Sequence, residues 1–541
     1  MTNQKKRQSL IIGALTGTAG IFISRALGLL YASPFQAMAG NDVIFYSIAY
    51  KMYDFLLMIS LSGIPFAVAT LVAKYVARDD YETVLMIRKV SSYILTAFGA
   101  ILCLVVMLGS GSIVQMLAPG RDADYLFKYQ VTLILISFAL AAVPILSIFR
   151  GFYQGLKEMK HYAFSQVLEQ IVRVTFLLGM GALSVYVFNK DSIWAVYFAV
   201  ISTSVSALSV IIYFKTVDKT KLSELKQLAK EQKTDGLSSK EVFSEIVHIA
   251  IPFFIISMIG NCSGMIDLWI VNPNLQVFGY SPEMADVVFS IMDYNAYKLV
   301  SIPQILGIGL SVALIPYVSS ALSVKDYEGI HSNIKKVYTF CCYLVYPVLL
   351  LMILFAPEIY YVMYGAENVI LGASILRWYL GLCFLWIIMT ISTNMLMVLE
   401  MKRVNLVWNV FTLVILIITM GPVTASFSYR GVYATYFILY VIYISVAWYL
   451  MYRKFNVKFI PILGTIAKTI FSLVAVFAVY FIFSQFGIDA ITNGRIFALF
   501  WVGFICACAM VAYFVLTYFM KLPQDIFDFN VSKLNFRKWK K

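Results

Sequence analysis

Five cationic residues lie inside long apolar stretches of the chain, where a charge is costly: Arg25, Lys51, Arg173, Lys298 and Arg377. A charged side chain at the centre of a bilayer costs roughly 2.5–3.5 kcal/mol on insertion scales, so such residues usually face a polar cavity or a partner inside a helical bundle. Arginine presents a planar fork to phosphate oxygens, and lysine presents a movable point charge. The pattern therefore predicts that the protein handles an anion within the membrane.

The stretches that carry these cations have the length and composition of membrane-spanning helices. The 541 residues are 61% hydrophobic and only 13% charged, which excludes an ordinary soluble protein. Most apolar stretches reach about 20 residues without alternation, which favours helices over barrel strands. We expect an all-α polytopic membrane protein with fourteen spans, at approximately residues 10–38, 43–76, 84–107, 127–149, 162–188, 193–214, 246–271, 285–322, 337–363, 370–399, 404–420, 432–452, 462–486 and 496–520.

The net charge of +14 follows from membrane topology rather than from nucleic-acid binding, which we do not expect. Among 42 lysines and arginines, only five fall in the expected outer loops: Arg121, Lys128, Lys190, Arg430 and Arg495. Five more are the intramembrane cations, and the other 32 lie on one side or at its rim; this excess predicts that both termini lie in the cytoplasm. The basic C-terminal tail is expected to contact anionic lipid head groups.

Cleavage, metal binding and catalysis are not expected. The apolar run after Lys5–Arg7 is too long for a signal peptide and contains Arg25, so it is interpreted as a retained first span. The seven cysteines show no metal-ligand spacing. The three histidines, at 161, 248 and 331, have no acid or cysteine partner in a catalytic spacing.

A charged cytoplasmic linker over residues 216–243 separates two similar halves. We expect a six-helix lobe over 1–215, a second six-helix lobe over 244–454, and a final helix pair with a basic tail over 455–541. The tripeptide Ala49–Lys51 recurs as Ala296–Lys298, and Asp80–Glu82 recurs as Asp326–Glu328, at offsets of 247 and 246 residues. Such parallel repeats are typical of transporters that rock two lobes around a central site.

The repeat makes Lys51 and Lys298 pseudo-symmetric, so a site between the lobes would recruit one from each. Arg25 lies at a comparable depth, and the three could share one layer. The alternative is that nearby acids, Asp54 and Asp293, neutralise the two lysines separately.

The remaining charges inside the spans have local explanations. Glu169 stands four residues before Arg173, the favourable order for an intrahelical ion pair with a structural role. Arg377 lies near the outer end of its span and is interpreted as an interface anchor. Asp267 could serve either as a partner for one of the cations or as a ligand for a coupling ion.

Two motifs resemble a known superfamily. The segment Arg150–Gly155 (RGFYQG), followed by Ser165–Val174 (SQVLEQIVRV), resembles polysaccharide exporters of the multidrug/oligosaccharidyl-lipid/polysaccharide (MOP) superfamily. The segment Ser24–Tyr31 (SRALGLLY), with Lys298 and the run Gly307–Pro316, resembles lipid II flippases of the MurJ type, particularly the Gram-positive branch. The resemblance covers essentially the whole chain.

The resemblance implies a bundle of two lobes with a cationic cavity between them, and a final helix pair that forms a groove for a polyprenyl tail. It implies that Arg25, Lys51 and Lys298 bind the diphosphate of lipid II or a similar polyprenyl-diphosphate saccharide, which alternating access carries to the outer leaflet. Further cavity or coupling residues would be Ser24, Asp54, Asp267, Asp293 and Tyr297. Tyr31 replaces a second basic residue found in some members, which makes the cavity less cationic. The expected location is the bacterial cell membrane, and the expected form is a monomer without a cofactor.

Two alternatives stay open on the sequence. One is a flippase for another lipid-linked saccharide, such as a capsule, teichoic or spore-cortex precursor. The other is an ion-coupled multidrug antiporter, for which Asp54, Asp267 and Asp293 would serve. Two energy sources are compatible with the residues: the membrane potential, worth roughly 2.3 kcal/mol per charge per 100 mV, or a monovalent ion.

Overall fold

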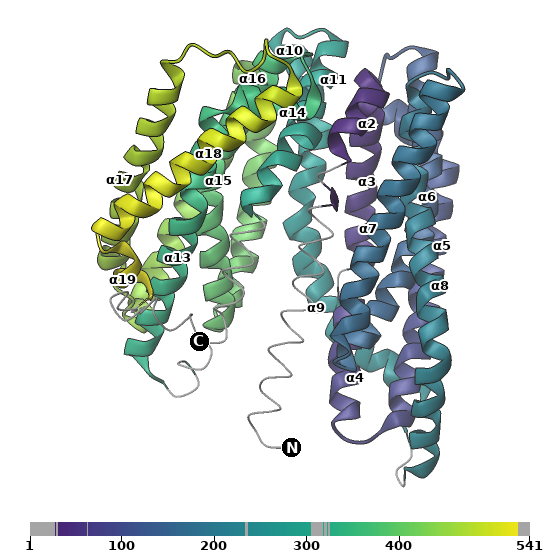
Figure 1. Ribbon diagram of the computed structural model, residues 1–541. Coiled ribbons are helices and arrows are strands. Elements are labelled where there is room, and N and C mark those ends of the chain that lie inside the picture. Colours follow the sequence, from purple (N-terminus) through teal and green to yellow (C-terminus); the bar gives the residue numbers. More distant parts are fainter. Residues whose placement is uncertain are drawn as a thin grey trace, which may run out of the picture. The chain divides into compact units, whose positions relative to one another are not determined.

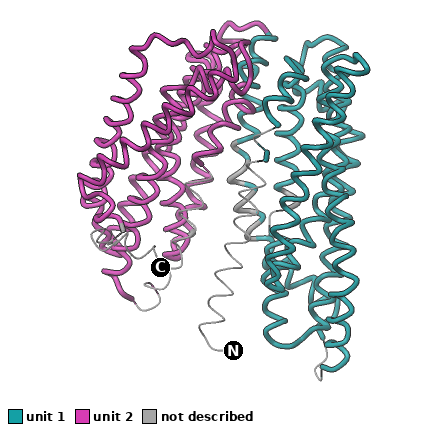
Figure 2. The backbone as a smooth tube through the Cα atoms, in the orientation of Figure 1, with its two compact units in different colours: residues 1–273, 282–290 teal, residues 274–281, 291–541 magenta. Residues whose placement is uncertain are grey.

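The computed structural model describes the backbone of residues 27–28, 31–61, 63–232, 236–304, 318, 322 and 325–527. These residues form helices joined by short turns, and no strand occurs among them. The chain divides into two compact units, coloured separately in Figure 2. Unit 1 comprises residues 1–273 and 282–290, and unit 2 comprises residues 274–281 and 291–541.

Unit 1 is built around α6, which packs against α3, α4, α5 and α8 (Figure 1). Its helical elements are α2 (Ala32–Ala39), η1 (Gly40–Asp42), α3 (Val43–Leu61), α4 (Ile64–Val76), α5 (Tyr81–Leu117), α6 (Ala123–Gly155), α7 (Met159–Ala182), η2 (Leu183–Val187), α8 (Ile193–Glu231), α9 (Ser239–Ile266), η3 (Asp267–Val271) and α11 (Pro282–Ser290). The helix α10 (Asn272–Phe278) crosses from unit 1 into unit 2.

Unit 2 is built around α13, which packs against α15 and α17, while α17 and α18 pack together. Its elements are η4 (Ile291–Ala296), a helix over 297–304, α13 (Tyr327–Leu354), α14 (Ala356–Tyr364), α15 (Val369–Val398), α16 (Lys402–Phe455), α17 (Phe459–Ser484), α18 (Arg495–Phe519) and α19 (Leu522–Phe527). The elements η2, η3 and η4 are π-helical.

The internal repeat is visible where α5 and α13 begin. Asp80 caps α5 by accepting a hydrogen bond from the backbone N–H of Thr83, and Asp326 caps α13 in the same way from Gly329. The residue before each cap is left-handed, with φ of 57° at Asp79 and 55° at Lys325. A capping side chain satisfies a backbone donor that the first helical turn leaves unpaired. The same device therefore starts the corresponding helix in each half.

The expected second span, 43–76, is two helices rather than one. The chain breaks at Gly63, which has φ +99°, a conformation that strains residues with a side chain. A Cβ at this position would lie 2.4 Å from the carbonyl oxygen of Ala250 in α9. The break thus lets α9 approach the backbone between α3 and α4.

Nine helices in the described part of the chain are long and apolar enough to cross a membrane, which makes this a multi-pass membrane protein. The expected spans 404–420 and 432–452 lie within α16, where Ser428 (φ 55°, ψ −148°) joins two helical segments across a kink. The expected first and eighth spans fall largely or partly outside the described residues. The number fourteen therefore stays a prediction.

The expected linker is partly helical, because α8 continues without interruption through Glu231. The following helix, α9, packs against α3, α4 and α5 of unit 1, although the sequence analysis assigns it to the second lobe. The division between the compact units accordingly lies after α9. The lobe boundaries at 215 and 244 stay predictions.

Candidate functional site

Lys51 lies on α3 between two other elements of unit 1. Its ammonium nitrogen is 5.0 Å from the ring centroid of Phe289 in α11. On the α9 side, Gly264 lies next to the lysine stem, because a Cβ there would be in ordinary van der Waals contact with Lys51 Cε, at 3.8 Å. A cation over an aromatic face is stabilised by roughly 0.5–2 kcal/mol. The position of Lys51 is thus set by α9 and α11 as well as by α3.

Lys298 lies just after η4, in unit 2. Its ammonium nitrogen is 5.7 Å from the ring centroid of Tyr294. The wider turn of a π-helix disturbs the regular backbone bonding, and here the carbonyl of Asn295 accepts a hydrogen bond from the Tyr364 hydroxyl at 2.9 Å. The side-chain amide of Asn295 also donates to the Tyr360 hydroxyl, at 2.9 Å. These bonds tie the turn before Lys298 to α14.

The other predicted site residues have varied surroundings. Ser24 and Arg25 lie outside the described residues. Asp54 is exposed, Tyr297 is 49% exposed, and Asp267 and Asp293 are half-buried at π-helical positions in η3 and η4. Because Lys51 belongs to unit 1 and Lys298 to unit 2, the shared cationic site stays a prediction.

A compact ionic network in unit 1 joins α6 and α7 and contacts α3 at Tyr50. Glu169 accepts from Arg173 at 2.6 Å, four residues later on α7, and from Arg150 of α6 at 2.7 Å. Arg150 also donates to the Ser165 hydroxyl at 3.0 Å. All three charged side chains are 13–15% exposed. The network holds two arginines around one carboxylate, so it carries a net positive charge.

The network reaches α3 through Tyr50, the residue before Lys51. Arg173 donates to the Tyr50 hydroxyl at 3.3 Å. The Tyr50 ring stacks on Tyr46 with centroids 5.1 Å apart and contacts Tyr53 at 5.3 Å. One edge of α3 is therefore fixed to α7, and the adjacent face carries Lys51.

The RGFYQG motif has a structural explanation at several of its positions. A Cβ at Gly151 would lie 2.6 Å from the carbonyl oxygen of Pro65, and one at Gly155 would lie 2.7 Å from Val72 Cβ. The two glycines allow α4 to pack directly on α6. Arg150 joins the network around Glu169, and Tyr153 donates to Asp218 of α8 at 2.8 Å.

Three sets of ionic contacts in unit 1 could not be predicted from the sequence. Arg150 and Glu169 are 19 residues apart on different helices, so no helical spacing relates them. Asp218 accepts from Arg88 at 3.0 Å, but in the sequence it is one charge among many in the connector. Arg121, an outer-loop cation by its place in the sequence, forms ion pairs with Asp286 and Glu283. These are contacts between distant segments, for which a single sequence carries no local signal.

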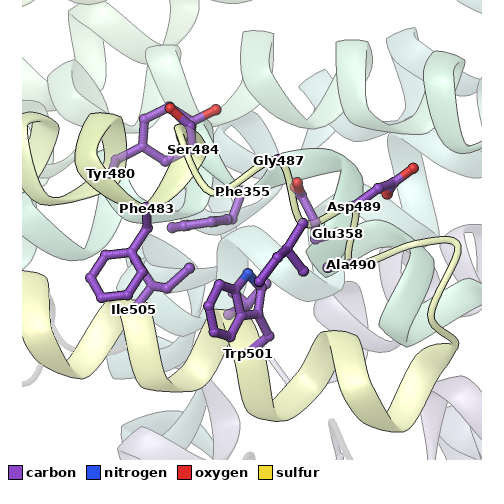
Figure 3. Close-up of a pocket in the computed structure, with 12 residues that line it drawn as sticks. Phe355, Glu358, Tyr480, Phe483, Ser484, Gly487, Asp489, Ala490, Trp501 and Ile505 are labelled. Carbon is purple, nitrogen blue, oxygen red and sulfur yellow. The ribbon is translucent and has the colours of Figure 1, made fainter.

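The final helix pair has a pocket at the end where α17 and α18 join, with a volume of about 240 Å³. Figure 3 shows the rings of Phe355, Phe483 and Trp501 around it, together with Glu358 and the loop residue Asp489. Carboxylates disfavour an anionic head group at this end. Large exposed apolar side chains run along both helices and include Phe471, Phe477, Phe481, Phe500, Phe504 and Val511. The tail-binding groove stays a prediction.

Comparison with known proteins places these features in context. A family model described as "Polysaccharide biosynthesis protein" matches residues 11–322. The chain is 29% identical to the lipid II flippase MurJ of Bacillus subtilis (strain 168), over 76% of this chain and 77% of that protein. It is 22% identical to stage V sporulation protein B of the same organism, over 67% of this chain and 68% of that protein.

Solved structures show the same fold. A lipid II flippase MurJ in an inward closed conformation aligns with a TM-score of 0.67 at 12% identity, over 94% of this chain and 99% of that one. An inward-facing multidrug transporter of the MATE family aligns with a TM-score of 0.60 at 11% identity, over 83% and 98%. Both likenesses concern architecture alone. The chain has the fold that MOP-superfamily transporters share. Because the family model matches more than half of the chain, the chain belongs to the polysaccharide biosynthesis protein family.

Proposed function

We propose that this protein is a flippase that moves a polyprenyl-diphosphate-linked saccharide, lipid II in the first instance, from the cytoplasmic to the outer leaflet. The observation that carries the proposal is the similarity to MurJ of Bacillus subtilis over three quarters of both chains. The paired lysines of the repeat, Lys51 and Lys298, support it as the groups that receive the diphosphate. The transport involves no covalent change of the substrate, so no catalytic cluster is required.

The substrate poses a physical problem that cations inside a helical bundle solve. Its diphosphate must avoid hydrocarbon, while its tail stays there. Charge-assisted bonds from lysine or arginine to phosphate oxygens are roughly twice as strong as neutral ones. In this proposal Lys51, next to Phe289 and Gly264, and Lys298, beside Tyr294, offer such bonds from the two halves, and Arg25 adds a third.

Alternating access follows from the repeat, with both termini in the cytoplasm. A diphosphate moving outward crosses an inside-negative potential downhill, by roughly 2.3 kcal/mol per charge per 100 mV. The membrane potential is therefore the energy source that the charges favour, and a monovalent ion held by Asp267 or Asp293 is the alternative. With the potential clamped at zero in proteoliposomes, transport should lose its driving force in the first case, whereas in the second a concentration gradient of the monovalent ion alone should still drive it.

The direct test is flipping of a fluorescent polyprenyl-diphosphate saccharide in proteoliposomes. Replacing Lys51, Lys298 or Arg25 with alanine should each slow flipping about 10- to 100-fold, since a hydrogen bond to a charged group contributes roughly 1.5–3 kcal/mol. Lys468→Ala is the matched control, because Lys468 is an exposed lysine that pairs with Asp525 on the surface of unit 2. Normal rates in all three site variants would reject the cationic site.

A second candidate substrate is a lipid-linked saccharide with a different head group. It is favoured by the family model, whose description, "Polysaccharide biosynthesis protein", names no particular saccharide. Competition between lipid II and a polyprenyl diphosphate that carries a different saccharide separates the two. Equal competition would mean that the site reads only the diphosphate and the tail, so that lipid II is not a preferred substrate.

A further inference from the structure

Unit 2 contains an apolar groove between α15 and the second segment of α16, with an arginine at its edge. Its volume is about 470 Å³, within the range of roughly 300–1,000 Å³ typical of ligand sites. The lining residues are Arg377, Trp378, Gly381, Leu382, Tyr433, Ala434, Phe437 and Ile438. Arg377 is the sole charged group in this lining.

The groove is open rather than filled by the protein. Trp378 is 43% exposed, Phe437 48% and Ile438 58%. A Cβ at Gly381 would meet nothing within 4 Å, so the glycine leaves empty space along α15. Because α15 and α16 both qualify as membrane spans, an exposed apolar face on them suits lipid chains rather than water.

Arg377 has donors to offer to a ligand. Its Nε donates to the carbonyl oxygen of Ile353 in α13 at 3.2 Å, which anchors one edge of the guanidinium. Within the described part of the chain, no carboxylate lies within 4.0 Å of it, although Glu358 exerts a longer-range attraction. The side chain is exposed. Its outer N–H groups can therefore form the bidentate contact that arginine makes with a phosphate.

The depth of Arg377 matches the head-group region. The 30 residues of α15 extend about 45 Å, whereas a hydrocarbon core is about 30 Å thick. Arg377 lies eight residues after Val369, about 12 Å along the helix. With α15 centred in the bilayer, Arg377 lies about 5 Å inside the hydrocarbon boundary, within reach of a phosphate by an extended arginine side chain.

We infer that Arg377 and this groove form a binding site for an anionic phospholipid, with the phosphate on the guanidinium and one acyl chain along Trp378, Gly381 and Phe437. Charge complementarity selects the phosphate, and the apolar lining selects the chain. The site lies entirely within unit 2 and depends on neither Lys51 nor Arg25. The distribution of basic residues places it in the outer leaflet.

Trp378 supplies a reporter for the test. The full-length protein is reconstituted with brominated phosphatidylglycerol or brominated phosphatidylcholine, and tryptophan quenching is titrated. The contribution of Trp378 is the part of the quenching that disappears in Trp378→Phe. We expect brominated phosphatidylglycerol to be favoured about fivefold at this residue, since an arginine near the surface contributes about 1 kcal/mol toward an anionic lipid.

Three variants separate the parts of the site. Arg377→Gln should abolish the preference, Arg377→Lys should retain it, and Gly381→Leu should reduce quenching by both lipids by filling the groove. Arg430→Gln is the matched control, since Arg430 is another exposed arginine of unit 2 that lies over Tyr429, and it should leave the preference unchanged. Thermal unfolding of each variant in detergent checks that it is folded.

Equal quenching by the two lipids in the wild-type protein, or an unchanged preference in folded Arg377→Gln, would overturn the inference. Preferential displacement of the brominated lipid by a polyprenyl phosphate would also overturn it, because the groove would then belong to the transported substrate.

Discussion

Arg173 and Arg377 both lie in membrane-spanning helices, but their surroundings are opposite. Arg173 is 15% exposed, with Glu169 at 2.6 Å and Tyr50 at 3.3 Å. Arg377 is exposed, and its hydrogen bond is to a single backbone carbonyl at 3.2 Å. A carboxylate one turn earlier on the same helix makes an arginine part of the protein interior. In an arginine without such a carboxylate, the N–H groups of the guanidinium stay available to lipid head groups.

The largest expected effect is the loss of the carboxylate that makes Arg173 an interior residue. Glu169→Ala would leave Arg150 and Arg173 buried together without a counter-charge. Removing one partner of a buried pair costs about 3–5 kcal/mol, and here two like charges remain. We expect a clear fall in thermal stability in detergent, measured by fluorescence-detected unfolding.

The control for this variant is an exposed pair in unit 2. Lys468 and Asp525 lie 3.0 Å apart with side chains 52% and 41% exposed. Exposed pairs contribute about 0–1 kcal/mol, so Asp525→Ala should shift the unfolding temperature little. A similar loss of stability in both variants would mean that the network around Glu169 has no special role.

The contrast between the two arginines was partly visible in the sequence. The spacing of Glu169 and Arg173 predicts their ion pair because both residues lie on one helix, and the recurrence of Asp80–Glu82 as Asp326–Glu328 indicates the internal repeat. Such features are local, and a periodic pattern encodes them. The membrane class and the all-helical fold could also be predicted, because composition and the length of the apolar stretches are read directly from the sequence.

Features that depend on contacts between distant segments could not be predicted. Arg150 joins Glu169 across two helices, and the break at Gly63 depends on Ala250, almost 190 residues later. The sequence suggested Arg377 as an anchor, but its groove is created by Tyr433 and Phe437 of another helix. A single sequence does not show which residues contact each other when they lie so far apart along the chain.

A second way to test the interior network is to move the helix that carries Arg150. Gly151→Ala would place a Cβ 2.6 Å from the carbonyl oxygen of Pro65, so α4 or α6 must shift. Overpacking of this kind costs typically about 1–3 kcal/mol. We expect lower thermal stability and slower flipping, since the shift reaches the network that holds Tyr50, the residue before Lys51.

Gly179 of α7 is the matched control, because a Cβ there would meet nothing within 4 Å. Alanine is better than glycine within a helix by roughly 0.5–1 kcal/mol, so Gly179→Ala should stabilise the protein slightly. The two substitutions should therefore have opposite signs. If both substitutions destabilise the protein, the effect at Gly151 is a general consequence of replacing a glycine in a membrane helix.

The smallest and most selective effect is expected from the same conservative substitution at both arginines. Arg173→Lys keeps the charge beside Glu169, but an ammonium on a shorter stem loses the bond to Tyr50 and with it about 1 kcal/mol. Arg377→Lys removes only an exposed hydrogen bond to a backbone carbonyl, so its stability should stay within about 0.5 kcal/mol of the wild type. Thermal unfolding of the two variants side by side measures the difference. An equal response would show that the Tyr50 bond does not distinguish the two arginines, and that burial beside Glu169 alone makes Arg173 an interior residue.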